Sequence, residues 1–296
     1  MTIATCLVLP EGLVFGVDST TSTALEIGYH YLNHNQKLFE VGSDSTMGIM
    51  TWGLSFFRDT SYRTLIARLS DDLKSNPPLT ILDAVARWRD LVWVEYREAF
   101  KNELRELKDI LERNRKSAIA VSDKRSEKDD DRFKELNELR VGFCFGGYCL
   151  PDRTPQAFYF DIEPNLISPP QIYPVVGELF KGQPAYFQRL YDGYDIKTRD
   201  AIVKAKDANG VSLWQGTKQD LNNILAEESL FYPELTIRDG IDFVHFSIYS
   251  TIKALKFSNR GQFCGGPIEL AVITTDRLFR WVRHKEFDSA LGYDGP

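Results

Sequence analysis

Short apolar runs mark both ends of the chain, whereas helical periodicity marks its middle. Residues 2–9 and 13–17 are apolar almost throughout and are separated by the turn sequence Pro10-Glu11-Gly12. Runs of this length without polar alternation indicate strands that are covered on both faces, and the residues between them favour a tight turn. Further strands are predicted at residues 37–41, 47–52, 268–274 and 278–282.

The middle of the chain has apolar residues at a spacing of three to four, which predicts helices. One helix is expected at residues 64–73, and a longer one begins near Thr80 and continues as far as Leu111. Residues 114–132 are highly charged and contain no aromatic residue, so we expect a mobile tip there. A solvated charged loop is the alternative reading of residues 122–131.

A second apolar stripe follows the charged tip and is formed by Phe133, Leu136 and Leu139. Together the two stripes predict a protruding helical hairpin, inserted at about residues 98–136. Because an apolar helix face needs a partner, we expect the stripes to pack against each other or against a neighbouring subunit. The first stripe consists of Leu104, Leu107, Ile110 and Leu111.

The last part of the chain returns to strands. Residues 141–147 and 156–161 predict a paired hairpin. Blocks of strands and helices in this order indicate a layered α/β domain rather than alternating βαβ units. Because neither an internal repeat nor a second core is visible, residues 1–296 are interpreted as a single domain with the helical insertion. Helices are predicted at residues 184–191, 219–226 and 237–257.

Composition narrows the classes of function. The chain has 296 residues, of which 43% are hydrophobic, and its formal net charge is -6. This charge provides no field that attracts nucleic acid or an anionic membrane, so neither is expected as a partner. The four cysteines match no zinc spacing, so we expect no metal and no cofactor. Without a basic leader or a membrane-spanning run, a reduced, cytoplasmic location is expected.

Several short motifs occur in order along the chain. TIAT at residues 2–5 precedes EGLVFGVDS at 11–19, and QKLFEV at 36–41 precedes MGIMTWG at 47–53. GGPIELAVI stands near the other end, at residues 265–273. In this order they resemble proteasome β subunits. The first two motifs are similar to the family's threonine strand and the strand followed by its acidic residue, and the next two to its lysine strand and the strand that ends in the oxyanion glycine. The last motif is similar to the family's late glycine-rich turn and strand.

The resemblance extends to the bacterial relatives of these subunits, because GELFKGQP at residues 177–184 is similar to the ancestral-β-subunit-like homologues, Anbu. It implies an α+β fold, the four-layer αββα sandwich of N-terminal-nucleophile hydrolases, and a threonine-type endopeptidase. It further implies that Thr2 is the nucleophile and that Lys37 is its electrostatic partner. Asp18 would orient Lys37, and the backbone N–H of Gly53 would serve the oxyanion hole.

The implied chemistry requires Thr2 to be the first residue of the mature chain. A threonine hydroxyl is a weak nucleophile, but the α-amine of an N-terminal threonine can act as its base. This amine has an ordinary pKa near ~8, so it can accept a proton and return it. Met1 must therefore be removed. A nearby ammonium such as that of Lys37 lowers the pKa of the hydroxyl, and a buried ammonium needs a partner such as Asp18.

Each of these residues also has a simpler explanation. Taken alone, Lys37 fits an exposed strand lysine, Asp18 a turn residue, and Thr2 a frayed first residue. Gly53 alone fits a glycine that ends a strand. Their joint occurrence in this order favours the functional interpretation.

The cysteines have two interpretations. Cys264 stands where the resemblance places a serine, so it either replaces a hydroxyl near the nucleophile or is a small buried residue. Cys6 lies within the first predicted strand, too far into the chain to use an α-amine as its base. We interpret Cys6 as a core residue.

Three functions fit these residues. The first is a proteasome-like threonine peptidase whose substrates are unfolded proteins or peptides and whose subunits form a homo-oligomer. The second is a catalytically silent subunit with a structural role, which a retained Met1 would favour. The third is an N-terminal-nucleophile amidase for a small amide. An ATPase partner is left open.

Large aromatic residues on the second predicted helix favour the homo-oligomer. Such side chains on a helix surface suggest buried subunit contacts, whereas packing in the chain's own core is the alternative. The residues are Trp88, Trp93, Tyr96 and Phe100.

Overall fold

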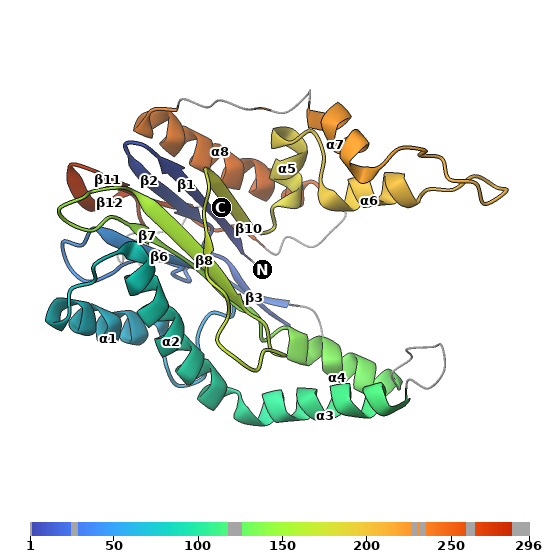
Figure 1. Cartoon of the computed structure of the whole chain (residues 1–296), viewed down its shortest axis with the longest axis horizontal. Helices are drawn as coiled ribbons and strands as arrows, with labels where there is room; N and C mark the ends of the chain where they lie inside the picture. The colour runs from blue at the N-terminus through green and yellow to red at the C-terminus, as the bar shows by residue number, and fades with distance from the viewer. Residues whose placement is uncertain are drawn as a thin grey trace.

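The computed structural model describes residues 2–24, 29–117, 126–226, 230, 235–258 and 264–285. Within these residues the strands form two five-stranded sheets and one two-stranded sheet, and every pair is antiparallel. The α+β class is therefore confirmed, as is the expectation that the chain is not built from βαβ units. Figure 1 shows the two sheets in the middle of the molecule with helices around them.

The first sheet has the strand order β10-β1-β2-β11-β12. Its strands are β1 (Ile3–Leu9), β2 (Gly12–Val17), β10 (Glu178–Gly182), β11 (Glu269–Thr274) and β12 (Arg277–Arg283). The second sheet has the order β5-β6-β7-β8-β9. Its strands are β5 (Leu38–Glu40), β6 (Met47–Gly53), β7 (Val141–Gly147), β8 (Gln156–Ile162) and β9 (Tyr173–Pro174).

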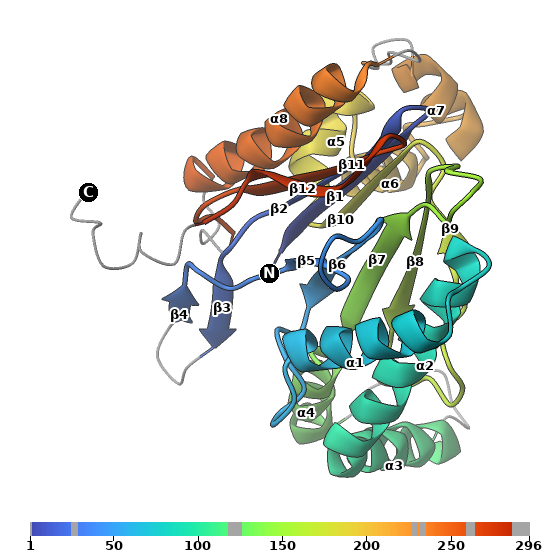
Figure 2. The ribbon, with the colours of Figure 1, turned by 90° about the vertical axis from the view of Figure 1, so that its left-hand side faces the viewer.

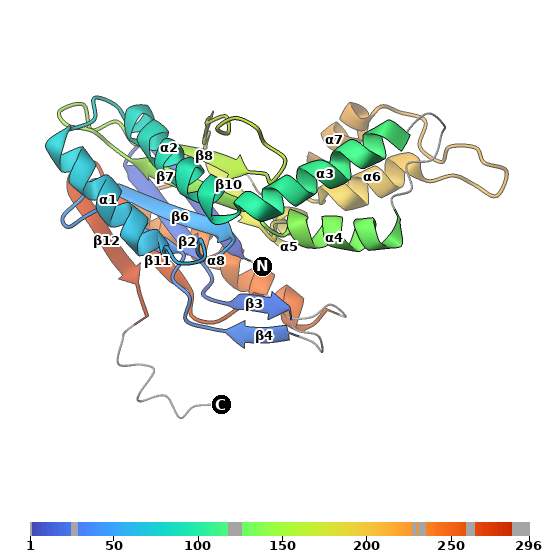
Figure 3. The same ribbon diagram turned by 90° about the horizontal axis from the view of Figure 1, so that it is seen from below.

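A small hairpin of β3 (Thr21–Ala24) and β4 (Tyr29–Leu32) stands apart from both sheets (Figure 3). The helices lie against the sheets or project from them. They are α1 (Tyr62–Ser75), α2 (Ile81–Ala99), α3 (Lys101–Ser117), α4 (Glu127–Asn137), α5 (Ala185–Tyr191), α6 (Ile196–Lys204), α7 (Lys218–Ala226) and α8 (Ile237–Lys256). No helix within the described residues is long and apolar enough to cross a bilayer.

Buried residues form separate cores on either side of each sheet. Between the two sheets, Phe15 of β2 packs with residues such as Met50 of β6 and Cys144 of β7. α8 packs on the other face of the first sheet, where Val244 joins the core of β1, β2 and β11. α1 and α2 pack on the other face of the second sheet, where Trp88 is fully buried. Figure 2 shows α8 and the α1–α2 pair on opposite sides of the sheets.

The two faces of β1 and β2 are both covered, as the continuous apolar runs predicted. All six residues of β2 are buried, and six of the seven residues of β1 are buried. Phe15 fits between the sheets because the facing strands carry glycine. A Cβ on Gly146 would lie 3.0 Å from Phe15 Cζ, and one on Gly48 would lie 3.4 Å from Phe15 Cε2. The first strand is therefore held in the centre of the fold.

The helical hairpin is present, but its first helix differs from the prediction. The helix expected from Thr80 to Leu111 is divided, because α2 ends at Ala99 and α3 begins at Lys101. Phe100, which lies between them, is buried in the same core as α2. Thr80 does begin the helix, since its side chain accepts a hydrogen bond from the backbone N–H of Asp83.

The predicted packing of the hairpin is confirmed in its main part. Leu107 and Ile110 of α3 form a buried cluster with Leu136 of α4, against which Leu111, Phe133 and Leu139 also pack. Leu104 instead belongs to the core beneath α2, because it is closer to the start of the hairpin. The helices also extend further than expected, since residues 114–117 belong to α3 and residues 127–132 to α4. Residues 118–125 of the proposed tip lie outside the described residues.

The aromatic residues of α2 are core residues, so the argument that linked them to subunit contacts is wrong. Trp88, Tyr96 and Phe100 are buried, and Trp93 packs against the same core. The rings of Trp88 and of Phe143 in the sheet beneath are 5.3 Å apart in an edge-to-face arrangement, and Tyr96 and Phe100 both contact the ring of Phe57. These large side chains fill the space between the second sheet and the two helices, α1 and α2, that cover it.

Most other predicted elements are confirmed to within a few residues, and short ones were missed. The strands at both ends, the β7–β8 hairpin and the helices α1, α5, α7 and α8 match the predicted ranges. The sequence analysis did not predict β3, β4, β9, β10 or α6. β10 is the most important of these, because it pairs with β1 and forms the edge of the first sheet.

Replacing Phe15 with Ala should lower the free energy of unfolding by about 3–5 kcal/mol, because the glycines opposite cannot fill the cavity. Phe257→Ala is the matched control, since Phe257 is 82% exposed and should change stability by less than about 0.5 kcal/mol. Urea denaturation followed by circular dichroism measures both variants. Equal stability of the two variants would contradict the packing of the two sheets described above.

Candidate active site

Thr2 lies directly before β1 and is 4% exposed. Its position is fixed by its neighbour Ile3, whose N–H donates to Asp18 Oδ1 at 2.9 Å and whose carbonyl accepts from the N–H of Asp18 at 3.1 Å. On the other side, β10 ends at Gly182, which pairs with Ile3. A Cβ on Gly182 would lie 1.8 Å from the carbonyl oxygen of Thr2, so only glycine allows this approach.

Asp18 is fully buried at the end of β2, and three groups donate to its carboxylate. Oδ1 accepts from the N–H of Ile3 and, at 2.7 Å, from Lys37 Nζ. Oδ2 accepts from the N–H of Gly265 at 3.0 Å. Hydrogen bonds of this kind offset the loss of hydration of a buried carboxylate. Asp18 is thus an anchor for three segments, rather than the turn residue that its position alone suggested.

Lys37 is 3% exposed and lies directly before β5. Its ammonium donates to Asp18 and also, at 2.6 Å, to the carbonyl of Thr20. Its own carbonyl accepts from the N–H of Thr51 in β6 at 2.9 Å. The simple reading of Lys37 as an exposed strand lysine is therefore excluded. The structure places the lysine beside the carboxylate that holds the start of β1.

Gly53 is the last residue of β6, and the register of the sheet fixes the direction of its N–H. Leu54 N donates to Arg140 O at 3.0 Å, so the next pair, Gly53 with Val141, is a pair without mutual hydrogen bonds. The N–H of Gly53 therefore points away from β7 and toward the side of β5. This is the side on which Thr51 N, two residues earlier, donates to the carbonyl of Lys37.

The backbone at Gly53 also requires glycine. Its φ is 87°, and a Cβ would lie 2.2 Å from Arg140 O. Gly53 is therefore a glycine that ends a strand, as the simpler explanation stated, and this does not conflict with a role for its N–H. The residue itself is exposed at the end of the strand.

Cys264 is 1% exposed and lies next to the glycine that donates to Asp18. Burial, together with the negative charge of Asp18, raises the pKa of its thiol to about 12. Both effects disfavour the thiolate, which is the nucleophilic form of a cysteine. Cys6 is buried between the sheets, as expected, and its pKa is also raised by burial.

Several groups around the Asp18 carboxylate could not be identified from the sequence. The backbone groups of Gly265 and Thr20 carry no sequence pattern of their own, and the fold alone brings them to Asp18 and Lys37. A second buried pair, Glu269 with Lys285, was also missed. Glu269 did leave a detectable pattern, since a carboxylate within the apolar run of β11 needs a buried partner.

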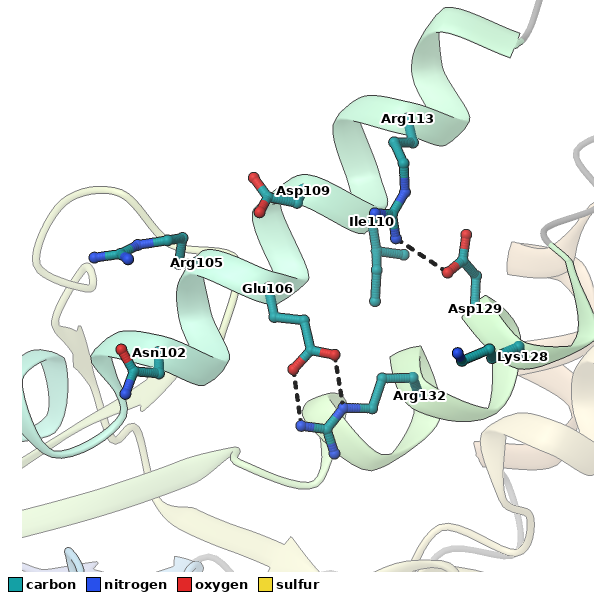
Figure 4. A pocket seen from close by; sticks show the side chains of 9 residues that line it. All are labelled: Asn102, Arg105, Glu106, Asp109, Ile110, Arg113, Lys128, Asp129 and Arg132. Atoms are coloured by element: carbon teal, nitrogen blue, oxygen red, sulfur yellow. Dashed lines mark hydrogen bonds and ion pairs between the residues drawn. The ribbon is translucent and has the colours of Figure 1, made fainter.

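A cavity of about 550 Å³ lies between α3 and α4, away from these residues (Figure 4). Its walls are charged and largely paired within themselves. Arg132 forms two hydrogen bonds with Glu106, and Arg113 contacts Asp129. None of the four predicted site residues lines it. Within the described residues there is also no group of three or more His, Cys, Asp or Glu that could hold a metal ion.

Neither a protein-family model nor a curated protein matches this chain. Among solved structures, it is similar to a mutant of Anbu from Hyphomicrobium sp. strain MC1, with 15% identity and a TM-score of 0.47, over 96% of this chain and 86% of that one. It is also similar to Anbu (ancestral beta-subunit) from Yersinia bercovieri, with 11% identity and a TM-score of 0.49, over 96% of this chain and 88% of that one. At such identities the similarity gives no information on activity.

Replacing Lys37 with Met should lower the free energy of unfolding by about 3–5 kcal/mol, because it leaves the buried carboxylate of Asp18 without its counter-charge. Lys181→Met is the matched control. Lys181 pairs with Asp161 at 2.7 Å, but these side chains are 24% and 36% exposed, so the loss should be at most about 1 kcal/mol. Urea denaturation measures both variants. Similar losses would show that the Asp18 pair contributes no more than a surface pair.

Proposed function

We propose that this chain is a proteasome-like subunit and that it hydrolyses peptide bonds with Thr2 as an N-terminal nucleophile after removal of Met1. The proposal includes a single domain over residues 1–296 and the αββα sandwich of N-terminal-nucleophile hydrolases. It is supported by the order of the packed layers, in which helices cover the outer face of each of two stacked sheets.

One observation carries the proposal: a single buried oxygen, Asp18 Oδ1, accepts from both Ile3 N and Lys37 Nζ. The residue that follows Thr2 and the ammonium of Lys37 are therefore joined through one atom. A buried lysine held by a carboxylate at the start of the first strand has a clear electrostatic use there. It lowers the pKa of a nearby hydroxyl and disfavours a positive charge on a nearby amine. Both effects assist a threonine that uses its own α-amine as base.

The proposed reaction begins when Thr2 Oγ attacks the carbonyl carbon of the peptide bond. The hydroxyl proton passes to the α-amine of Thr2 and then to the leaving amine, so the C–N bond breaks and an ester to Thr2 remains. Water hydrolyses this ester by the same proton path in reverse. The N–H of Gly53, which points to the Lys37 side of β6, is assigned to the oxyanion that forms at the attacked carbonyl.

The test combines the mass of the purified chain with cleavage of fluorogenic peptides and casein. The mature chain should lack Met1, and Thr2→Ala should abolish cleavage. Lys37→Ala should lower kcat by about 10²–10⁴-fold, the range of base and electrostatic contributions in other enzymes. Thr5→Ala is the matched control: Thr5 lies on the same strand, is 1% exposed and contacts Ser247 Oγ at 3.0 Å, so cleavage should persist.

The alternatives give different results in the same experiment. A chain that keeps Met1 and cleaves nothing would be a silent subunit, because its α-amine would belong to the wrong residue. A chain that begins at Thr2 and hydrolyses only small amides would be an amidase of the same mechanism. Cleavage that survives Thr2→Ala would contradict the mechanism itself.

We further propose that copies of this chain associate through α6 and the segment that follows it, because both expose apolar side chains. α6 has no buried residue, and Ile196 and Ile202 on it are 54% and 38% exposed. The segment after α6 adds Val211 and Leu213, which are 56% and 65% exposed (Figure 1). Exposed apolar side chains gathered on one projecting element favour burial against a partner.

Sedimentation velocity at micromolar concentration should therefore show an oligomer, and Leu213→Glu should dissociate it. Ile167→Glu is the matched control, since Ile167 is 90% exposed but lies outside this surface. A monomer in the parent chain, or equal effects of the two substitutions, would contradict the assignment of this surface.

A further inference from the structure

A second buried ion pair lies next to the Asp18–Lys37 pair. Lys285, which follows the end of β12, donates to Glu269 Oε2 at 3.0 Å. The Glu269 side chain is fully buried and that of Lys285 is 11% exposed. Removing one partner of a pair of this kind leaves an uncompensated buried charge, so each group constrains the position of the other.

Lys285 is the hydrogen-bond partner of one carboxylate oxygen of Glu269, Oε2. His284 Nδ1 also lies 2.7 Å from Glu269 Oε1, but these two atoms do not meet at hydrogen-bonding angles. His284 instead stacks on Trp281, with the ring centroids 4.0 Å apart. The buried carboxylate therefore directs the ammonium of Lys285, and the remaining two contacts of that ammonium show what it is directed toward.

Those two contacts are with the segments that carry Asp18 and Lys37. Lys285 Nζ donates to Ser19 Oγ at 3.2 Å and to the carbonyl of Asn35 at 2.8 Å. Ser19 directly follows Asp18, and Asn35 stands two residues before Lys37. The same two segments are also joined directly. Asn35 N donates to Ser19 O at 3.0 Å, Asn35 Nδ2 donates to Thr21 Oγ1 at 2.7 Å, and Thr20 Oγ1 donates to Asn33 Oδ1 at 2.9 Å.

The electrostatics agree with this placement. Burial lowers the pKa of Lys285, Glu269 opposes this shift, and the nearby charges of Lys37 and Arg63 lower it further. The two ammonium groups are thus close enough to interact. Because each has its own carboxylate, Asp18 for Lys37 and Glu269 for Lys285, neither can take the partner of the other without leaving a buried charge unpaired.

We propose that Lys285 is a positioning residue that fixes the distance between the Asp18 and Lys37 segments, with Glu269 holding it in place. The inference rests on the proposed function for its catalytic consequence, but its structural part does not. Catalytic groups that shift by about 1 Å can lose about 10²-fold in rate, so a brace between the two segments would act on kcat.

The experiment replaces Lys285 with Cys and then restores the ammonium chemically. Alkylation with 2-bromoethylamine converts the introduced cysteine into a close analogue of lysine, and iodoacetamide adds a neutral group of similar size as the matched control. Cys149→Ser serves as the background, because the other three native cysteines are buried and Cys149 is only partly so. The background chain receives both reagents in parallel.

Two quantities are measured on each sample: peptide cleavage, and hydrogen exchange of the amides of Ile3, Asn35 and Gly265. In the background chain, which keeps Lys285, these amides should exchange slowly. Lys285→Cys should lower the melting temperature, because Glu269 loses its counter-charge. Well below that temperature, it should speed the exchange of these three amides more than that of the α2 amides, and lower kcat at least about tenfold with little change in KM. Aminoethylation should reverse these effects, whereas carbamidomethylation should not.

The positioning role would be overturned if Lys285→Cys left exchange and kcat unchanged, or if both alkylations restored them equally, since filling space would then suffice. A background chain that begins at Thr2 yet cleaves no peptide would reject the proposed function instead. In that case the exchange of the three amides alone decides whether Lys285 braces the two segments.

Discussion

The buried carboxylate of Asp18 is the constraint around which the site is arranged. A carboxylate without water is stable only if hydrogen bonds and a counter-charge replace its hydration. Here the replacements come from three places in the chain: the start of β1, the start of β5 and the glycine turn before β11. Satisfying one charge therefore brings these segments to one point. Any displacement of Lys37 is opposed by the cost of leaving Asp18 unpaired.

The stacked sheets make this arrangement possible, because they exclude water from Asp18 and Lys37. Phe15 packs over glycines of β6 and β7, so the sheets approach closely along the strand that leads to Asp18. The same close packing appears at Gly182, where β10 reaches the carbonyl of Thr2. Close-packed interiors transmit small changes, so the geometry of the site depends on the core as well as on its polar groups.

Two buried ion pairs, Asp18–Lys37 and Glu269–Lys285, lie on neighbouring segments and make different contacts. The first holds an ammonium near the start of β1, and the second contacts the backbone and hydroxyl groups beside the first. Such an arrangement gives a lysine both a fixed position and a positive neighbour. Preorganised charges of this kind need no rearrangement when a negative charge develops nearby.

The sequence by itself determined the α+β class and most of the longer strands and helices, because these leave a local pattern. It gave Thr2, Asp18, Lys37 and Gly53 as candidates only through the order of several motifs, since each of these residues taken alone has a simpler explanation. Apolar runs and helical stripes reflect burial directly, and Gly53 ends a strand in a backbone conformation that requires glycine. Only the tertiary structure decided the partners. Two of the three donors to Asp18 are backbone N–H groups, which every residue except proline has, so no residue type marks them in the sequence. One of them, the N–H of Gly265, is 247 positions away from Asp18. The sequence also did not decide whether the aromatic residues of α2 pack in the core or at a subunit interface, because both environments are rich in large aromatic side chains.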